Sequence, residues 1–311
     1  MRLGRIAFLG TDPFAIPILA RLADLADELL VVTQPDRPAG RGLEPRPSAV
    51  AAFARAAGLR VETPTRLRSP EATASVRAFV PDGLVCVAYG QLVPAELLGA
   101  FARPPLNVHP SLLPRHRGAA PVAATIRAGD AEGGVTLMVM TERLDAGPIV
   151  EQWRVPLEGR ESTAALEGRL AKLAAAVVPP VLVRWAASEL RSVPQDDAAA
   201  TLTRPFTRED GRIAWDDAAE AIDRQVRALQ PWPGTWTLAG GRRLHVRAAR
   251  PAPAEEGAAP GTLLGSEPRV ACGRGSLVLE LVQPEGRGIM PGADWRRGAG
   301  RGLDRLGVEA S

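Results

Sequence analysis

Several residue types are scarce in this sequence, and each shortage excludes a class of protein. The two cysteines, Cys86 and Cys272, lie far apart in the 311 residues and form no C-x-x-C pair, so neither a disulfide framework nor a zinc site is expected. No apolar run approaches the roughly 18 to 20 residues of a membrane-spanning helix. The short apolar run near the first residue is broken at residues 11–13, unlike the run in a signal peptide. We therefore expect a cytoplasmic protein without a membrane segment.

The sequence also has few aromatic side chains and no strong excess of either charge. The chain has 38 basic and 35 acidic residues, which gives a formal net charge of +3, and only 4% of its residues are aromatic. This balance gives no bulk signal for nucleic-acid binding. The overall composition, with 46% hydrophobic and 23% charged residues, is ordinary for a globular protein. The length predicts two domains.

Through the first half of the chain, short β-rich runs alternate with alanine-rich stretches. The runs that we expect to form strands are residues 5–9, 29–33, 84–89, 106–109 and 134–140. The clearest helices are residues 14–26 and 48–57, the second with Ser48 as N-cap and Gly58 after its end. Such alternation predicts an α/β fold with a doubly wound, mostly parallel sheet. Ligands bind such sheets beyond the carboxyl ends of the strands.

The second half predicts a change of architecture. Residues 163–188 have the pattern of one long helix, and residues 190–205 are polar and aperiodic, as a linker would be. A helix at 218–229 precedes short strands, which we place at residues 236–238, 244–248, 269–271 and 277–282. Gly-rich turns between those strands suggest a small β-barrel. The domain prediction is a catalytic domain over 1–188, a linker over 189–206 and a second domain over 207–311.

One polar cluster stands out in the first domain. Asn107 and His109 are two apart on an expected strand, so their side chains point to one face, and Pro110 should end that strand. If the next strand lies beside it, Asp145 in the following loop reaches the same edge. An amide, an imidazole and a carboxylate together suit acyl transfer without a serine or cysteine nucleophile. On spacing alone, a structural histidine and a turn-forming Asx residue are the commoner interpretation. We expect His116 and His245 to be structural or on the surface.

A longer motif surrounds these residues. Asn107-x-His109-x-Ser-Leu-Leu-Pro-x-x-Arg117-Gly118, followed by Leu-Asp145-x-Gly, resembles the signature of folate-dependent formyltransferases and hydrolases. The resemblance implies that Asn107, His109 and Asp145 are catalytic and that 10-formyltetrahydrofolate is the donor, with no metal required. It also implies that Ser111, Leu112, Leu113 and Pro114 line the folate site and that residues 87–90 form a neighbouring wall. Pro110 departs from the small residue that many relatives have after the histidine.

Other segments concern the acceptor of the formyl group. Residues 34–42, including Arg37 and Arg41, resemble the loop that the methionyl-tRNA formyltransferases of this family use against the acceptor stem of Met-tRNA. The usual lysines are missing after it, so fewer phosphate contacts are expected. The opening residues resemble the same group, and the sequence after Gly10 lacks the further glycines of a dinucleotide fingerprint.

Two motifs of the second domain, residues 212–215 and 231–236, resemble the carboxyl-terminal domain of that group. The resemblance implies an OB-like barrel that binds tRNA, and residues 286–307 hold five arginines and two aspartates. We expect most of Trp215, Trp232 and Trp236 to be core residues. We expect a monomer that formylates initiator Met-tRNA for translation initiation. The alternatives are a formyltransferase for an amino-sugar nucleotide or ribonucleotide amine, and a non-catalytic RNA-binding protein on this scaffold.

Overall fold

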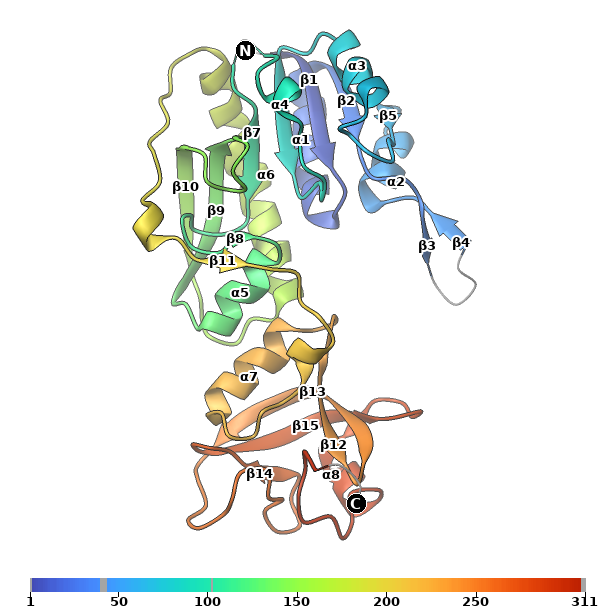
Figure 1. The fold of residues 1–311 in the computed structure, drawn as a ribbon, viewed down its shortest axis with the longest axis vertical. Helices are drawn as coiled ribbons and strands as arrows, with labels where there is room; N and C mark the ends of the chain where they lie inside the picture. The colour runs from blue at the N-terminus through green and yellow to red at the C-terminus, as the bar shows by residue number, and fades with distance from the viewer. Residues whose placement is uncertain (1, 40–43, 102, 309–311) are drawn as a thin grey trace. The chain divides into compact units, whose positions relative to one another are not determined.

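The structure, a computed structural model, describes residues 2–39, 44–101 and 103–308. Contacts between backbone segments divide the chain into two units, each of which is discontinuous in sequence (Figure 1). The first unit comprises Met1–Pro121, Glu132–Val155 and Glu167–Thr203, and the second comprises Val122–Ala131, Pro156–Leu166 and Arg204–Ser311.

A seven-stranded sheet forms the centre of the first unit. Its described strands are β1 (Leu3–Gly10), β2 (Ala26–Val32), β5 (Arg60–Glu62), β6 (Gly83–Val87), β7 (Leu106–His109), β9 (Glu132–Val139) and β10 (Ile149–Pro156), in the order β10-β9-β7-β6-β1-β2-β5. The pairs from β7 to β5 are parallel, whereas β9 runs antiparallel to β7. The prediction of a mostly parallel sheet is therefore confirmed, and all five expected strands lie in it.

Helices and short loops flank this sheet. They are α1 (Ile16–Leu25), α2 (Ala49–Ala56), α3 (Pro70–Ala78), α4 (Ala95–Leu98) and α6 (Thr163–Ala186), with the 3-10 turn η1 (Pro13–Ala15) before α1. The helix α5 (Pro121–Ala128) falls almost entirely within the second unit. Ser48 caps α2 as expected, because its hydroxyl accepts a hydrogen bond from Ala51 N at 3.0 Å. Gly58, just beyond α2, has a φ of +69°, which only glycine adopts without strain.

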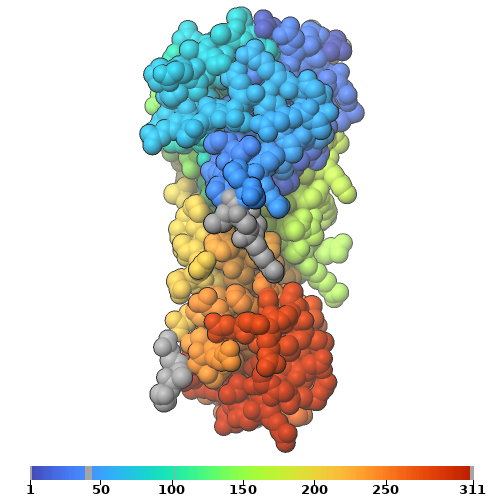
Figure 2. All heavy atoms as spheres, turned by 90° about the vertical axis from the view of Figure 1, so that its right-hand side faces the viewer, coloured from blue at the N-terminus to red at the C-terminus, as the bar shows by residue number. Residues whose placement is uncertain are grey.

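A short hairpin, β3 (Arg37–Ala39) with β4 (Glu44–Arg46), extends from the β2 side of the sheet. Figure 2 faces this side, where blue and cyan atoms, which belong to the first part of the chain, form the surface of the first unit. Among the described helices, none is long and apolar enough to cross a membrane.

The second unit is built on an antiparallel sheet. Its strands are β12 (Thr235–Ala239), β13 (Arg242–Ala252), β14 (Arg269–Ala271), β15 (Ser276–Pro284) and β16 (Met290–Pro291), ordered β12-β13-β15-β14 with β16 beside β15. Helices α7 (Ala219–Ala228) and α8 (Gly292–Arg297) complete it, after the turn η3 (Glu209–Gly211). The four expected strands and the expected helix are confirmed, and β16 and α8 are additional.

Single backbone bridges continue the pairing beyond the ladder of the second unit. Val270 in β14 bridges Leu263, Thr262 bridges Arg305, and Ala239 in β12 bridges Leu306. These bridges lead from one outer strand of the sheet back towards the other. They enclose a core around α7 that includes Trp215 and Trp295, which are 5% and 2% exposed. The OB-like connectivity implied by the resemblance stays a prediction.

The stretch expected as a linker has structure of its own. It contains the turn η2 (Asp197–Ala199) and the short strand β11 (Leu202–Thr203), which pairs in parallel with β8 (Arg117–Gly118). Val193 and Ile149 exchange two backbone hydrogen bonds of 2.8 Å. Residues 193–203 therefore lie along the first unit, anchored to it at several points.

Candidate active site

The amide and imidazole of the motif project from β7. Asn107 and His109 are two residues apart on this strand, and β7 ends at His109, with Pro110 directly after it. Asn107 lies opposite Cys86 of β6 and Met138 of β9. The expectation that one face of a strand end carries both polar side chains is consistent with this placement.

Asp145 reaches these residues by a different route from the one expected. β9 is the neighbour of β7, but because the two strands are antiparallel, the end of β9 at Val139 lies beside Leu106, at the start of β7. The loop after β9 must therefore turn back along β7 to bring the carboxylate to His109. Asp145 itself has a φ of +50°, a left-handed conformation that aspartate tolerates better than most residues.

The three side chains lie together and largely away from solvent. His109 is 4% and Asp145 9% exposed. Asp145 Oδ2 is 3.6 Å from His109 Nδ1, and Asp145 Oδ1 lies 3.4 Å from Asn107 Nδ2, which donates to it. Both contacts are long, so neither the amide nor Nδ1 is fully committed to the carboxylate. A reacting group can therefore take a hydrogen bond from the amide, and it can take one from Nδ1 when the ring is doubly protonated.

Two backbone groups of the loop after β7 hold the arrangement. The Nε2 atom of His109 is 3.0 Å from the carbonyl oxygen of His116, and since a carbonyl can only accept, Nε2 carries a proton. Gly118 N donates to Asp145 Oδ2 at 2.8 Å. When Nδ1 is protonated as well as Nε2, the ring carries a positive charge and attracts the carboxylate. His116, expected to be structural or on the surface, is buried and supplies this carbonyl.

The segment expected to line the folate site, residues 111–114, is shaped by two side chains that sequence reasoning missed. Thr136, fully buried, accepts from Leu113 N at 3.2 Å and donates to the carbonyl of Ser111 at 2.7 Å. Gln152 donates to Leu113 O at 2.7 Å and to the Thr136 hydroxyl at 2.9 Å. The sequence offered one signal for such a role, which is a lone threonine within an apolar strand, because a buried hydroxyl needs hydrogen-bond partners.

The predicted folate residues differ in how far they are exposed. Ser111 and Leu113 are buried, whereas Leu112 and Pro114 are half-buried. The Ser111 hydroxyl donates to the carbonyl of Arg115 at 2.7 Å, so it closes the turn itself. Leu112 and Pro114 are the side chains of this segment that remain partly accessible to a ligand.

The wall next to β7 is formed by the end of β6 and residues 87–90. Burial, reinforced by the charge of Asp145, raises the pKa of the Cys86 thiol to about 12, although a hydrogen bond from the Tyr89 backbone opposes the shift. Burial likewise raises the pKa of Tyr89. Neither group is ionised near neutral pH, so neither is a nucleophile there. Among the described atoms, the buried Tyr89 hydroxyl has no hydrogen-bond partner.

Of the two arginines expected to contact tRNA, Arg37 begins β3. Arg37 donates to the side-chain oxygen of Gln34, and Gln34 donates to Tyr89 O at 2.8 Å. Arg37 is thus tied to the wall beside the site, while its side chain stays exposed. Arg41 lies outside the described residues. In the part of the chain that the structure describes, no three His, Cys, Asp or Glu side chains gather as metal ligands would.

These features define a class. On a doubly wound α/β sheet, an amide, an imidazole and a carboxylate converge without an ionised nucleophile, as in a site that polarises an acyl group for attack by an external amine. Residues 4–182 match the formyl transferase family and residues 205–300 match the formyl transferase C-terminal domain. The chain belongs to the formyl transferase family.

The similar proteins with established names agree with each other. The chain is 45% identical to the methionyl-tRNA formyltransferase of Gluconacetobacter diazotrophicus, covering 94% of this chain and 96% of that one. It is 46% identical to that of Roseiflexus castenholzii, with 97% and 99% covered. The corresponding values for Thermus thermophilus are 42%, 95% and 96%.

Solved structures share the fold at much lower identity. The sugar 3N-formyl transferase WlaRD superimposes with a TM-score of 0.65 at 14% identity, covering 92% of this chain and 100% of that one. HypX from Aquifex aeolicus in complex with tetrahydrofolic acid gives 0.63 at 17% identity, with 93% and 46% covered. At such identities the similarity establishes the fold alone.

Proposed function

We propose that this protein transfers the formyl group of 10-formyltetrahydrofolate to the amino group of initiator Met-tRNA, giving N-formylmethionyl-tRNA for translation initiation. The observation that carries the proposal is the similarity to methionyl-tRNA formyltransferases, which exceeds 40% identity and extends over both domains. In this role the protein acts in the cytoplasm, where translation takes place, and we expect it to work as a monomer.

The three polar side chains have complementary roles in this reaction. The amine of methionine attacks the formyl carbon, a C–N bond forms, and the carbonyl oxygen becomes an oxyanion. Asn107 Nδ2 and the protonated ring of His109 donate to that oxygen. Asp145 balances the charge of the ring, from 3.6 Å, and takes up the proton that the amine loses. The carbonyl then re-forms as the C–N bond to the folate breaks, and the folate nitrogen leaves with the proton that Asp145 took up from the amine.

Leu112 and Pro114, the accessible side chains of residues 111–114, face the donor in this proposal, and residues 87–90 form the opposite wall. The folate ring system is flat and largely apolar, which suits such side chains. We assign the donor site and the chemistry to residues 1–188 and the connection to residues 189–206.

We assign tRNA binding to residues 207–311 as an OB-like domain, together with Arg37 and Arg41. Trp232 is 61% exposed, and the Arg208 guanidinium lies 5.8 Å from the centre of its ring. The Arg243 guanidinium lies 4.2 Å from the ring of the buried Trp236. An exposed aromatic ring beside arginines supports contact with nucleic acid through stacking and phosphate binding.

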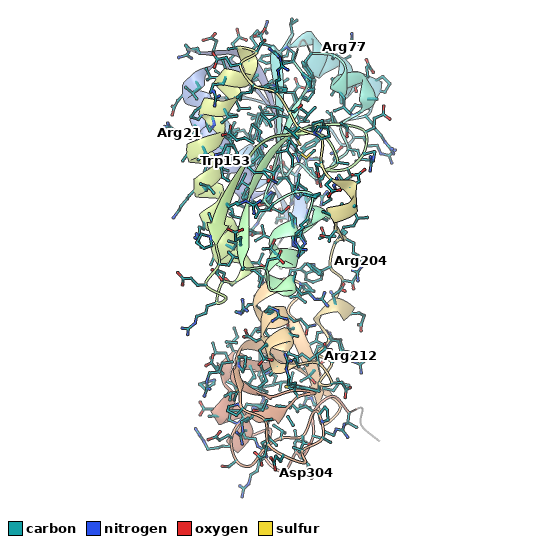
Figure 3. All side chains as sticks on the ribbon, turned by 90° about the vertical axis from the view of Figure 1, so that its left-hand side faces the viewer. Arg21, Arg77, Trp153, Arg204, Arg212 and Asp304 are labelled. Atoms are coloured by element: carbon teal, nitrogen blue, oxygen red, sulfur yellow. The ribbon has the colours of Figure 1, made fainter. Side chains whose placement is uncertain are left out.

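Further cations lie at the beginning of the same unit. Arg204 and Arg212, labelled in Figure 3, are both exposed. Arg204 is held by Asp210 through hydrogen bonds of 2.8 and 2.6 Å, whereas the Arg212 guanidinium lies 5.7 Å from the ring of Trp236. Such side chains add phosphate contacts to those of Arg208 and Arg243.

The deciding experiment is a formylation assay with purified protein and 10-formyltetrahydrofolate. Three acceptors are offered in parallel, namely Met-tRNA, free methionine and an amino-sugar nucleotide, and His109→Ala serves as the inactive control. We expect transfer to Met-tRNA alone, and loss of transfer in the variant while its folding and tRNA affinity are kept.

Other outcomes select the alternatives. Transfer to the sugar nucleotide alone would keep the catalytic assignment and remove the tRNA acceptor. The amino-sugar nucleotide is included because the chain shares its fold with a sugar 3N-formyl transferase. If no acceptor is formylated but Met-tRNA is bound, the protein is an RNA-binding member of the family.

A further inference from the structure

The segment between α6 and the second unit makes contacts at the site that no periodicity in the sequence indicates. Residues 193–203 run from the bridge between Val193 and Ile149 to the pairing of β11 with β8. On the way they pass the loop that carries Asp145 and the turn that follows β7. The segment thus touches both loops from which the catalytic side chains are held.

Gln195 binds the backbone of the Asp145 loop. Its Nε2 atom donates to Asp145 O at 2.9 Å and to Gly147 O at 2.7 Å. A Cβ atom on Gly147 would lie 1.8 Å from Val139 O, so the loop passes close to the end of β9 and has little room to shift. With two carbonyls fixed on one amide, the left-handed backbone of Asp145 is held in a single arrangement.

The other end of the Gln195 amide is fixed in turn. Its Oε1 accepts from Arg117 Nε at 3.0 Å and from Arg117 Nη2 at 2.8 Å. The Arg117 side chain is only 5% exposed and also pairs with Asp197, at 2.8 Å. This bidentate contact orients the amide so that its NH₂ group must face the two carbonyls.

The same segment supports the anchor of His109. The Thr201 hydroxyl accepts from His116 N at 2.8 Å, and Thr201 O accepts from Arg117 N at 2.9 Å. His116 and Gly118 in this turn supply the carbonyl that binds His109 and the N–H that binds Asp145. Both anchors of the catalytic pair therefore depend on residues 195–203.

We propose that Gln195 is a positioning residue for formyl transfer, which sets the Asp145 carboxylate relative to His109 by holding the carbonyls of Asp145 and Gly147. The proposal rests on the proposed function, because it assigns Gln195 a role in that reaction. Gln195 binds backbone carbonyls of the loop, and its hydrogen bonds within the described residues involve none of the side chains of Asn107, His109 and Asp145. In this proposal it therefore affects turnover without contacting either substrate.

The test uses the full-length protein and Gln195→Glu. This variant keeps the size of the side chain and its pairing with Arg117, but it replaces the two N–H donors by an oxygen that repels both carbonyls. Because a misplacement of about 1 Å costs on the order of 100-fold in rate, we expect kcat to fall roughly 10- to 100-fold. The KM values for folate and Met-tRNA should change less than about threefold, and the melting temperature should change little.

A matched control is Gln225→Glu in the second unit. Gln225 also donates from one amide to two backbone carbonyls, those of Asp210 at 2.8 Å and Arg212 at 3.1 Å. It is 7% exposed, so its loss should lower the melting temperature. Because it lies outside the catalytic domain, any effect on tRNA binding should appear in the KM for Met-tRNA and not in kcat. Gln195→Glu should show the opposite pattern.

Amide hydrogen exchange of the peptide over residues 141–148 provides a reading that needs no substrate. Faster exchange there in Gln195→Glu, together with the loss of kcat, supports the proposal. Unchanged exchange, or a kcat equal to that of the wild type, overturns it. If the wild-type protein formylates no acceptor, the proposed function fails, and the exchange measurement still decides whether Gln195 holds the Asp145 loop.

Discussion

Asp145→Asn isolates the charge of the carboxylate from its shape. An asparagine can keep its oxygen towards Gly118 N, which now donates to Asp145 Oδ2 at 2.8 Å, so the loop should fold as before. What it loses is the attraction to the ring of His109, at 3.6 Å, in the protonated form that the proposed mechanism requires. Both side chains are less than a tenth exposed, so solvent screens this attraction weakly.

The expected loss follows from that distance. With an effective dielectric constant of about 20, a unit charge pair at this separation is worth roughly 4 kcal/mol. At about 1.4 kcal/mol per factor of ten, full loss in the transition state would slow the reaction about 1,000-fold. Part of the attraction exists before the reaction begins, so we expect a decrease of roughly 100- to 1,000-fold in kcat.

The assay is steady-state formylation of Met-tRNA at saturating donor, with melting temperature and folate binding measured on the same preparation. Asp27→Asn is the matched control, since it removes a carboxylate whose partner Arg2 lies at 2.6 Å with both side chains more than half exposed. Such exposed pairs contribute about 0 to 1 kcal/mol. A folded Asp145→Asn protein that retains kcat within about fivefold of the wild type would refute the charge-matching role.

Three further predictions concern other groups. Asn107→Ala should lower kcat roughly 100- to 1,000-fold through the lost oxyanion donor, measured in the same assay; unchanged turnover would exclude that role. Burial raises the pKa values of Cys86 and Cys272 to about 12. A thiol reagent at pH 8 should therefore modify neither thiol in the native protein and both thiols after denaturation. Rapid labelling of the native protein would contradict this prediction. Burial, with the charge of Asp12 adding to it, raises the pKa of Glu167 from 4.5 to about 7. Between these two pKa values the native state binds one proton more than the unfolded state, so the stability of the fold falls as pH rises through this range. Glu167→Gln should therefore raise the melting temperature at pH 8 but not at pH 4. Equal shifts at both pH values would contradict this pKa shift.

Local patterns predicted most elements of the fold. The cap at Ser48 and the turn at Gly58 came directly from residue preference, and the apolar runs located every expected strand. Trp215 and Trp236 are core residues as anticipated for most of the tryptophans, while Trp232 is exposed. These features depend on neighbours in sequence, which is why one sequence suffices to predict them.

The direction of β9 could not be predicted in the same way. This strand is buried on both faces over most of its length, so it lacks the alternation that marks many antiparallel strands. The alternation of strands and helices along this half of the chain predicted a mostly parallel sheet, and the structure places a helix, α5, before this strand, as in a parallel crossover. Instead, the loop after β7 passes through His116, Gly118 and Ala120, all with positive φ, and the chain enters β9 from the end at which β7 finishes.

The sequence indicated that three polar side chains would lie together, but it did not indicate the residues that support them. Asn107, His109 and Asp145 come together as expected, because the motif fixes their identity and two of them share a strand. Thr136 and Gln195 left no comparable signal. Their contacts join residues 25 and about 50 positions apart, and single hydrogen bonds of that range leave no period in a sequence.

The anchoring of residues 193–203 on the first unit has a consequence for where the chain can be cut. A protein ended after α6, at residue 188, would keep every strand of the main sheet and the side chains of Asn107, His109 and Asp145. It would lack the amide that holds the Asp145 loop and the hydroxyl that holds His116 N. Such a fragment should fold and bind folate yet turn over slowly, whereas one that ends at Thr203 keeps both supports. The smallest catalytic unit therefore extends into the stretch that connects it to the next domain.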